Sequence, residues 1–390
     1  MKEHICIISP GYPTEGNPYY TFVDQLVCAL ADMGIRCTVI APQSATKILL
    51  KRAPKNPKKW VKLTKHGNEV NIYQPLMYTI SDIRVFNYDI GETFFELTFE
   101  KAVRPVFNSL QDKPNILYGH FWNCGIIAAK IAYENKLPAF VATGECDIKI
   151  LEKNKDTKTK AIIDSIKGVI SVSSENKEES IKLGLVDENK VSVIPNAIDH
   201  DRFYKMNKSE MRKELGFSKD DFIVIFVGWF IERKGPQRVA EALRELSGVK
   251  SIFIGSGEQY PNCENILFCG RVAHENVAKY LNCADVFVLP TLAEGCCNSI
   301  IEAMACSLPI VSSDLSCNDD ILKQEYSIRV DPTNIKQIAE AIYYIKEHPF
   351  ERIKMSEAAL IAAGEFTIEE RARKIWSFMV SKLLEDKNEN

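Results

Sequence analysis

The sequence predicts an α/β protein built from two Rossmann-like domains with parallel sheets. Apolar segments with the length of strands alternate with amphipathic segments with the length of helices along most of the chain, which is typical of this class. One segment, Phe222–Val227, is apolar at every position, as expected of a strand that is buried on both faces. The 390 residues are enough for two domains of ordinary size.

Composition and charge exclude several classes of function. A net charge of −3 gives no overall attraction to nucleic acid, so we expect no nucleic-acid partner. No apolar run approaches the roughly 20 residues of a membrane-spanning helix, and a strand follows Met1 almost directly, so we expect no secretory signal. The 12 cysteines form no C-x-x-C pair, which favours a reducing cytoplasm over a zinc site or a disulfide framework.

The chain opens with a β-loop-α-β unit. Residues 4–9 form an apolar strand, apolar side chains recur at helical spacing over residues 22–30, and residues 37–41 form the next strand. The intervening loop lacks the G-x-G-x-x-G pattern, which disfavours a dinucleotide cofactor. Gly16 in this loop either lets the backbone approach a ligand closely or serves as an ordinary turn glycine.

The next segment, residues 47–65, is rich in cations and contains no acid. It is either a solvated loop or a patch for anionic lipid headgroups or a lipid-linked pyrophosphate acceptor. The second interpretation places a cytoplasmic protein peripherally on the inner face of the cell membrane. The cations are Lys47, Lys51, Arg52, Lys55, Lys58, Lys59, Lys62 and Lys65.

A helix over residues 94–110 and four strands complete the first half. Because ligands bind beyond the carboxyl ends of parallel strands, His120, which follows the strand 115–119, is expected to be exposed toward a ligand. The alternative is a structural, hydrogen-bonded histidine. Glu145 and Asp147 follow another strand and could contact an acceptor. The remaining strands are residues 138–142, 168–172 and 191–194.

In the second half, two cations follow the strand Phe222–Val227. Arg233 and Lys234 lie beyond its carboxyl end and before a helix, where they could neutralise an anionic leaving group; otherwise they are exposed loop cations. Further strands are expected at residues 251–254 and 266–270, and Arg271–Val272 follow the latter.

Residues 286–313 contain the most informative pattern. A strand over 286–289 leads to a loop with Glu294, a helix near 297–307 with Glu302, and another strand over 309–311. The start of this helix, at Asn298 and Ser299, offers amides and a positive dipole end to a phosphate. A carboxylate on an apolar helix needs a partner, which is either a ligand hydroxyl or a salt bridge within the domain.

These residues strongly resemble the E-x7-E signature of the retaining family 4 glycosyltransferases, which have the GT-B fold. The matching residues are Glu294–Gly295, Asn298, Glu302–Cys306 and Pro309–Ser313. Pro195–Asp199 is similar to the P-N-G-[IV]-D phrase at the family's domain junction. The family usually has glycine where Ser307 stands, at a helix end that favours glycine, so we expect a strained cap there.

The resemblance implies two domains facing a central cleft, with residues 1–199 binding the acceptor and 200–366 the nucleotide sugar. Residues 367–390 would form a helix that packs back on the first domain. The implied reaction moves a sugar from a nucleotide-sugar donor, with UDP favoured, to a glycan or lipid-linked glycan with retention of configuration. Bacterial surface polysaccharide synthesis is the implied setting. Since no D-x-D stands at a strand end, we expect neither a metal nor another cofactor.

The resemblance also implies roles for individual residues. Glu302 would hold the ribose hydroxyls, and Glu294 those of the donor sugar. Many members have an arginine where Trp229 stands, and Arg233 would substitute for it. The other implied contacts are Asn298 and Ser299 to the diphosphate, Arg233 and Lys234 to the leaving group, Gly16 and His120 near the donor, and the backbone of Arg271 and Val272 along the base.

Two alternatives stay open at this point. The first is a nucleotide-sugar epimerase of the same architecture, which would need no acceptor. The second is a catalytically weak member that only binds the nucleotide sugar, which the tryptophan at position 229 leaves open.

Overall fold

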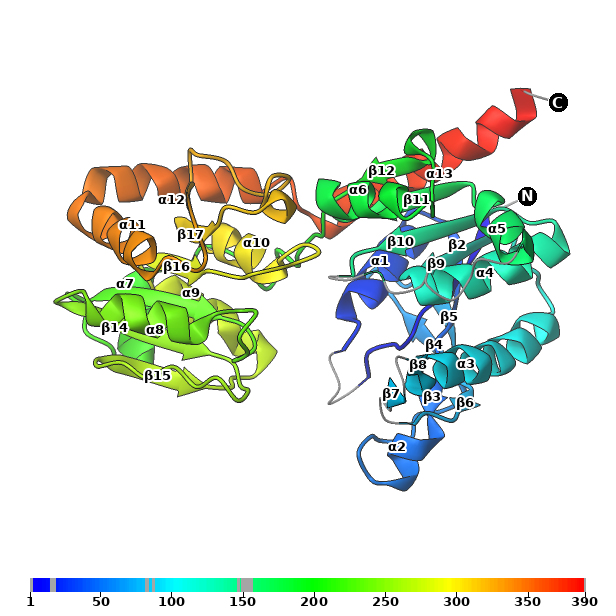
Figure 1. The fold of residues 1–390 in the computed structure, drawn as a ribbon, viewed down its shortest axis with the longest axis horizontal. Helices are drawn as coiled ribbons and strands as arrows, with labels where there is room; N and C mark the ends of the chain where they lie inside the picture. Colours follow the sequence, from blue (N-terminus) through cyan, green and yellow to red (C-terminus); the bar gives the residue numbers. More distant parts are fainter. Residues whose placement is uncertain are drawn as a thin grey trace. The chain divides into compact units, whose positions relative to one another are not determined.

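The computed structural model describes residues 3–14, 19–80, 84–85, 88–145, 148 and 157–388. The chain divides into two compact units, which we call unit 1 and unit 2 (Figure 1). Unit 1 combines residues 1–172, 176–194 and 371–390, and unit 2 combines residues 173–175 and 195–370. The chain therefore returns to unit 1 at its end.

Unit 1 contains, among the described residues, an eight-stranded sheet in the order β12-β11-β10-β9-β1-β2-β5-β4. All neighbouring strands are parallel except β4, which pairs antiparallel with β5. The strands are β1 (His4–Ile8), β2 (Arg36–Ile40), β4 (Lys59–Leu63), β5 (Glu69–Tyr73), β9 (Ile116–His120), β10 (Ala139–Thr143), β11 (Gly168–Ser171) and β12 (Val191–Val193). Two short pairs lie outside this sheet: β3 (Gln43–Ser44) with β6 (Leu76–Met77), and β7 (Arg84–Val85) with β8 (Tyr88–Asp89).

The helices of unit 1 pack closely on this sheet. A Cβ atom at Gly119 of β9 would lie 2.3 Å from the Cα atom of Gly125, so only glycine allows α4 to approach the strand. A Cβ atom at Gly168 of β11 would lie 2.8 Å from the Phe378 ring of α13. The helices are α1 (Thr21–Asp32), α2 (Ala45–Leu49), α3 (Ile90–Ser109), α4 (Trp122–Asn135), α5 (Thr157–Asp164), α6 (Ser174–Lys182), the 3-10 helix Glu188–Lys190, and α13 (Ile368–Asn388).

The cation-rich segment is only partly a loop, formed by residues 50–58. It contains α2 and the edge strand β4, where Lys62 pairs with Asp24 of α1 (Nζ to Oδ1, 2.6 Å). The side chains of Leu49 and Leu50, at the end of α2, are exposed beside Lys51 and Arg52. In the described part of the chain, no helix is both long enough and apolar enough to cross a bilayer.

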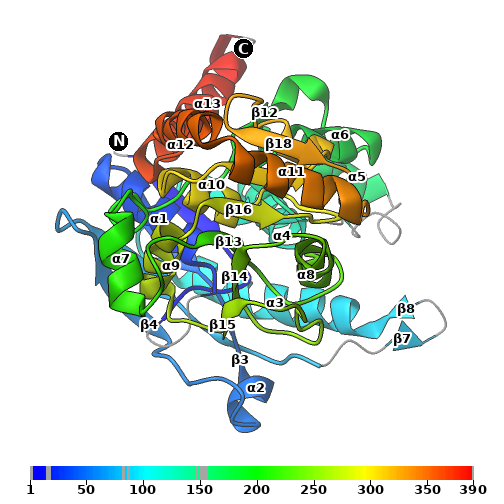
Figure 2. The same cartoon turned by 90° about the vertical axis from the view of Figure 1, so that its left-hand side faces the viewer.

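Unit 2 contains a six-stranded parallel sheet in the described chain, with the order β15-β14-β13-β16-β17-β18. Helices α8 and α11 lie on one face, and α7, α9 and α10 lie on the other (Figure 2). The strands are β13 (Phe222–Val227), β14 (Val249–Ile254), β15 (Ile266–Gly270), β16 (Val286–Leu289), β17 (Ile310–Ser313) and β18 (Ser327–Val330). The helices are α7 (Lys208–Leu215), α8 (Pro236–Arg244), α9 (Val277–Cys283), α10 (Asn298–Ala305), α11 (Ile335–Glu347), α12 (Pro349–Ala363) and the 3-10 helices His274–Asn276 and Ser316–Asn318.

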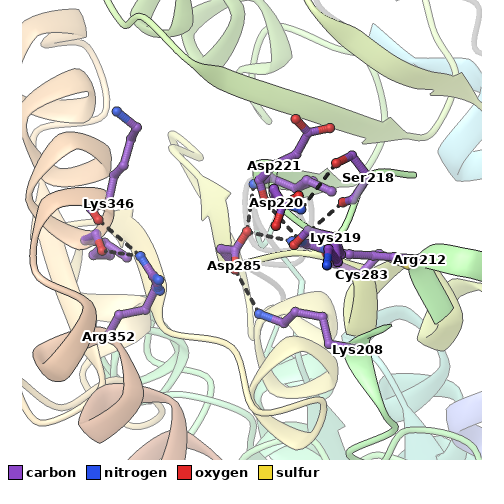
Figure 3. Close-up of polar contacts among 12 residues, drawn as sticks. Lys208, Arg212, Ser218, Lys219, Asp220, Asp221, Cys283, Asp285, Lys346 and Arg352 are labelled. Carbon is purple, nitrogen blue, oxygen red and sulfur yellow. Dashed lines mark hydrogen bonds and ion pairs between the residues drawn. The ribbon is translucent and has the colours of Figure 1, made fainter. Parts of the chain in front are cut away.

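A buried ion cluster fixes the amino ends of β13 and β16 (Figure 3). The Asp285 carboxylate accepts from Arg212 (2.8 Å), from the Ile223 N–H (2.8 Å) and from Lys208 (2.9 Å). Arg212 also donates to the Cys283 carbonyl (2.8 Å) and is 4% exposed. Because every contact is a charge-assisted hydrogen bond, the cluster holds both strands in register. We call it the Asp285 anchor.

Candidate active site

Three charged side chains meet beyond the carboxyl ends of β13 and β16. The Glu294 Oε1 atom lies 2.5 Å from the Lys234 Nζ atom and 3.1 Å from the Arg233 Nη1 atom. It also accepts a hydrogen bond from Thr291 Oγ1 (2.8 Å). We call Arg233, Lys234 and Glu294 the charged triad. The sequence predicted each member singly, and the structure brings all three together.

Two loops hold the charged triad in place. The Leu292 N–H donates to the Arg233 carbonyl (2.8 Å), which joins the loop after β16 to the loop after β13. Lys234 is only 11% exposed. Burial by itself would lower its pKa, but Cys297 and the Glu294 carboxylate raise it, and the net shift is upward. Lys234 is therefore a fixed, permanently charged group, whereas Arg233 is about one-third exposed.

The backbone beside the charged triad is glycine-dependent. Gly255 follows β14 with φ of 156°, a region that favours glycine. A Cβ atom there would lie 1.8 Å from the Gly228 carbonyl oxygen, so only glycine lets the loops after β13 and β14 approach each other. Trp229, which follows Gly228, is 48% exposed.

Helix α10 opens next to the charged triad. Cys297 precedes it in an extended conformation, without a side-chain cap, so the N–H groups of Asn298 and Ser299 begin the helix. The side chains here are already placed: Asn298 Oδ1 accepts from Asn196 (2.9 Å), and the Cys297 sulfur lies 3.3 Å from the Ser299 hydroxyl. Ser307, two residues past the end of α10, has φ of 61°, as the expected glycine-like position requires.

Glu302 lies on α10 in a different environment. Its side chain is 13% exposed, and the His274 Nε2 atom lies 3.9 Å from its Oε1 atom. Burial raises the pKa of Glu302 to about 7, against the smaller opposing effect of Arg202. The site therefore combines one carboxylate held by two cations with another that is nearly unpaired. Arg271 is exposed and Val272 is half-buried after β15.

The residues expected to contribute from unit 1 are placed differently. His120 is buried rather than exposed, with its ring 5.0 Å from Phe22 and 4.9 Å from Phe121 between centroids. Burial, reinforced by Arg371, lowers the pKa of His120 to about 3, so the ring is neutral. Its Nδ1 atom is buried without a hydrogen-bond partner among the described residues.

Three other residues of unit 1 were expected to contribute, and the structure describes only one of them, Glu145. The Glu145 carboxylate is occupied by Thr143 Oγ1 (2.8 Å) and the N–H groups of Gly144 (2.8 Å) and Trp122 (2.5 Å), so it caps α4. Gly16 and Asp147 lie outside the described residues.

The sequence patterns did not single out Thr291, Arg202 or His274. Thr291 could have been found from the sequence, because it lies in the same loop as Glu294, after the buried strand β16. Arg202 and His274 contact each other 72 residues apart in the chain, and no local pattern marks them. In the described part of the chain, no group of three or more His, Cys, Asp or Glu side chains could hold a metal ion.

Comparisons with known proteins cover both units. A family model described as Glycosyltransferase Family 4 matches residues 21–202, and one described as Glycosyl transferases group 1 matches residues 207–361. The chain is 25% identical to a Bacillus subtilis protein named as a teichuronic acid biosynthesis glycosyltransferase, over 87% of this chain and 88% of that one. It is 28% identical to the UDP-Gal:alpha-D-GlcNAc-diphosphoundecaprenol alpha-1,3-galactosyltransferase of Escherichia coli, over 53% and 58% of the two chains.

Solved structures share the fold at low identity. Sucrose-phosphate synthase from Thermosynechococcus elongatus superposes with a TM-score of 0.75 at 18% identity, covering 98% of this chain and 100% of that one. Anabaena HepE, in complex with UDP, superposes with a TM-score of 0.71 at 16% identity, covering 98% and 100%. The expected architecture of two Rossmann-like domains with parallel sheets is confirmed.

Proposed function

Because the chain belongs to the glycosyltransferases of the GT-B fold, we propose that it moves a sugar from a UDP-sugar to a lipid-linked glycan with retention of anomeric configuration. The setting would be the synthesis of a bacterial surface polysaccharide. The name of the B. subtilis relative supports this setting, and the name of the E. coli relative supports a lipid-linked acceptor. The same E. coli name and the UDP complex of Anabaena HepE support the nucleotide.

The observation that carries this proposal is the charged triad beside the start of α10. Lys234 and Arg233 supply two positive charges at the carboxyl edge of the sheet, where α/β proteins bind their ligands. The first amides of α10 add the positive end of a helix dipole. Such a site suits the diphosphate of a nucleotide sugar. Arg271 and Val272 would border the base, and Glu302 the ribose.

Glu294 would act on the sugar while holding the cations. Its contacts with Lys234, Arg233 and Thr291 all go to Oε1, so Oε2 is the oxygen that we assign to a donor hydroxyl. The carboxylate therefore sets the distance between the donor sugar and the two cations. Electrostatic groups that are fixed before the reaction stabilise developing charge most effectively.

The chemical step that we propose occurs on one face of the sugar. The bond between the anomeric carbon and the phosphate oxygen breaks, and the acceptor oxygen bonds to the same face of that carbon. The departing phosphate takes the acceptor proton, so the products are the glycoside and the nucleoside diphosphate. Lys234 and Arg233 would stabilise the negative charge that develops on the leaving phosphate. We propose that these two cations make a metal ion or other cofactor unnecessary.

The decisive test supplies UDP-glucose, UDP-galactose and UDP-N-acetylglucosamine with an undecaprenyl-diphosphate-linked sugar, in EDTA. We expect glycosylated lipid whose new anomeric centre, measured by NMR coupling constants, has the donor's configuration. Inverted product would refute retention, and dependence on Mg²⁺ would refute the metal-free site. An altered sugar nucleotide without acceptor would identify an epimerase, and UDP binding without any conversion would identify a catalytically weak member.

We also propose peripheral membrane contact through residues 47–65. The exposed Leu49 side chain, at 82%, lies at the end of α2 among cations, and this combination suits insertion beneath anionic headgroups. A cytoplasmic enzyme bound in this way would meet a lipid-linked acceptor at the inner face of the membrane.

Sedimentation with phosphatidylglycerol vesicles tests this contact. Each cation near such a surface contributes about 1 kcal/mol, so charge reversal of Lys55, Lys58 and Lys59 should weaken binding at least about a hundredfold. The control is charge reversal of Lys336 and Lys354, which are exposed on α11 and α12 of unit 2. Equal binding by both variants would rule out the patch.

A further inference from the structure

We propose that His274 is a positioning residue for Glu302. Arg202 would determine which tautomer of the His274 ring is present. This series of contacts, from Arg202 through His274 to Glu302, would orient the Glu302 carboxylate toward the ribose hydroxyls of the donor. The inference rests on the proposed function, because it assumes that the ligand of Glu302 is a ribose.

The three side chains come from three separate segments of unit 2. Arg202 lies in the turn that follows Asp199, His274 begins the 3-10 helix His274–Asn276, and Glu302 lies on α10. An Arg202 Nη1 atom contacts His274 Nδ1, and His274 Nε2 lies 3.9 Å from Glu302 Oε1. Phe203, which is fully buried, packs edge-on against the His274 ring at 5.7 Å between centroids. The ring is therefore held from two sides.

The donor chemistry of arginine determines where the proton of His274 resides. A guanidinium only donates hydrogen bonds, so the Nδ1 atom that it contacts must be an acceptor. In a neutral imidazole the proton then resides on Nε2, which is the atom that faces Glu302. Burial, followed by Arg202, lowers the pKa of His274, which agrees with a neutral ring. His274 thus presents an N–H group to the carboxylate.

This N–H group matters because Glu302 has little else to hold it. The distance of 3.9 Å is that of a loose contact, which can shorten when ribose hydroxyls draw the carboxylate toward them. A directed donor favours the ionised carboxylate, which accepts hydrogen bonds from both hydroxyls. The affinity for the nucleotide should then fall as the pH drops and Glu302 takes up a proton. Besides Arg202 on the turn, the charged and titratable groups that face His274 and Glu302 are Asp199 on the same turn, Glu275 on the 3-10 helix and Cys306 after α10.

The test compares two amide replacements of the histidine by calorimetry at pH 8. His274→Gln places its N–H donor near the former Nε2 position, whereas His274→Asn places it near Nδ1. With UDP, we expect His274→Asn to weaken binding on the order of tenfold and His274→Gln to stay within about threefold of the wild type. With 2′,3′-dideoxy-UDP, which lacks the ribose hydroxyls, the three proteins should bind equally. The melting temperatures without nucleotide should also be equal.

Several outcomes would overturn the inference. Equal losses in the Gln and Asn variants would show that His274 acts through bulk alone, and a loss that persists with the dideoxy nucleotide would show that it does not act through the ribose. An affinity for UDP that does not change from pH 8 to pH 6 would argue against the ionised carboxylate. Glu302→Ala separates the ribose assignment of Glu302 from the positioning role of His274. If this variant keeps the preference for UDP over dideoxy-UDP, the ribose assignment itself fails. If Glu302→Ala loses that preference while His274→Asn keeps it, the ribose assignment holds and only the positioning role of Arg202 and His274 is refuted.

Discussion

Replacing Glu302 by glutamine should stabilise the unliganded protein, although it removes a group of the candidate site. The pKa of this buried carboxyl rises from 4.5 to about 7 on folding, and burial is the main cause. At 1.36 kcal/mol per pKa unit, this shift destabilises the folded state by about 3 kcal/mol at pH 8. Glutamine has a similar shape and carries no charge, so the substitution removes this cost.

The dependence on pH gives the sign of the effect. A carboxyl whose pKa is raised by folding contributes its full stability below pH 4.5, and this contribution is lost as the pH rises through about 7. The advantage of Glu302→Gln should therefore be below about 1 kcal/mol at pH 5 and reach about 3 kcal/mol at pH 8. For a domain of this size, the latter corresponds to a rise of about 6 °C or more in melting temperature.

The assay is calorimetric melting of wild type and variant at pH 5 and pH 8, with the transition of unit 2 identified by its response to nucleotide. Glu294→Gln is the matched comparison, because Glu294 balances the charge of the buried Lys234. It should destabilise unit 2 at pH 8 by about 2 kcal/mol or more. Our reasoning would be refuted if Glu302→Gln lowered stability at pH 8, or if its advantage did not grow with pH.

Three further predictions concern the charged triad, the Asp285 anchor and the close approach of Gly255 to the Gly228 carbonyl. Lys234→Ala should lower kcat about a hundredfold or more, and Arg233→Ala, at a more exposed position, about tenfold; equal effects in steady-state kinetics would contradict this ranking. Asp285→Asn should cost unit 2 about 3 kcal/mol in urea unfolding, because Arg212 would keep a buried charge with reduced compensation, and an unchanged midpoint would contradict the structural role. Gly255→Ala should abolish nucleotide binding in a thermal-shift assay, since its Cβ atom meets the Gly228 carbonyl, whereas full binding would show that the loops adjust.

Several features of the fold could be predicted because neighbours in sequence determine them. The apolar runs at Phe222–Val227 and Val286–Leu289 mark strands that are buried on both faces. The left-handed conformation of Ser307 follows from the helix end at which it stands. The strand β4 escaped prediction because its lysines obscured the alternation of Lys59–Leu63. The Gly67 turn before β5, with φ of 82°, was the available hairpin signal.

The three members of the charged triad could each be singled out from the sequence, but their pairing could not. Glu294 and Lys234 each follow a strand, yet only the strand order of the sheet brings the two loops together. The burial of His120 depends on Phe22, which is almost 100 residues earlier in the chain. The difference between Glu294 and Glu302 likewise depends on tertiary neighbours, because both are glutamates of the same motif.

The Asp285 anchor has a consequence for how unit 2 could diversify. The anchor binds the amino ends of β13 and β16, while the charged triad lies beyond their carboxyl ends, one strand length away. Loops at the carboxyl edge of the sheet, where the candidate site lies, can therefore be exchanged without loosening the Asp285 anchor that keeps the strands aligned. For protein engineers, this separation makes the loops after β13, β14 and β16 suitable for grafting from relatives with other donor preferences. The residues of the Asp285 anchor should be kept unchanged in such grafted variants.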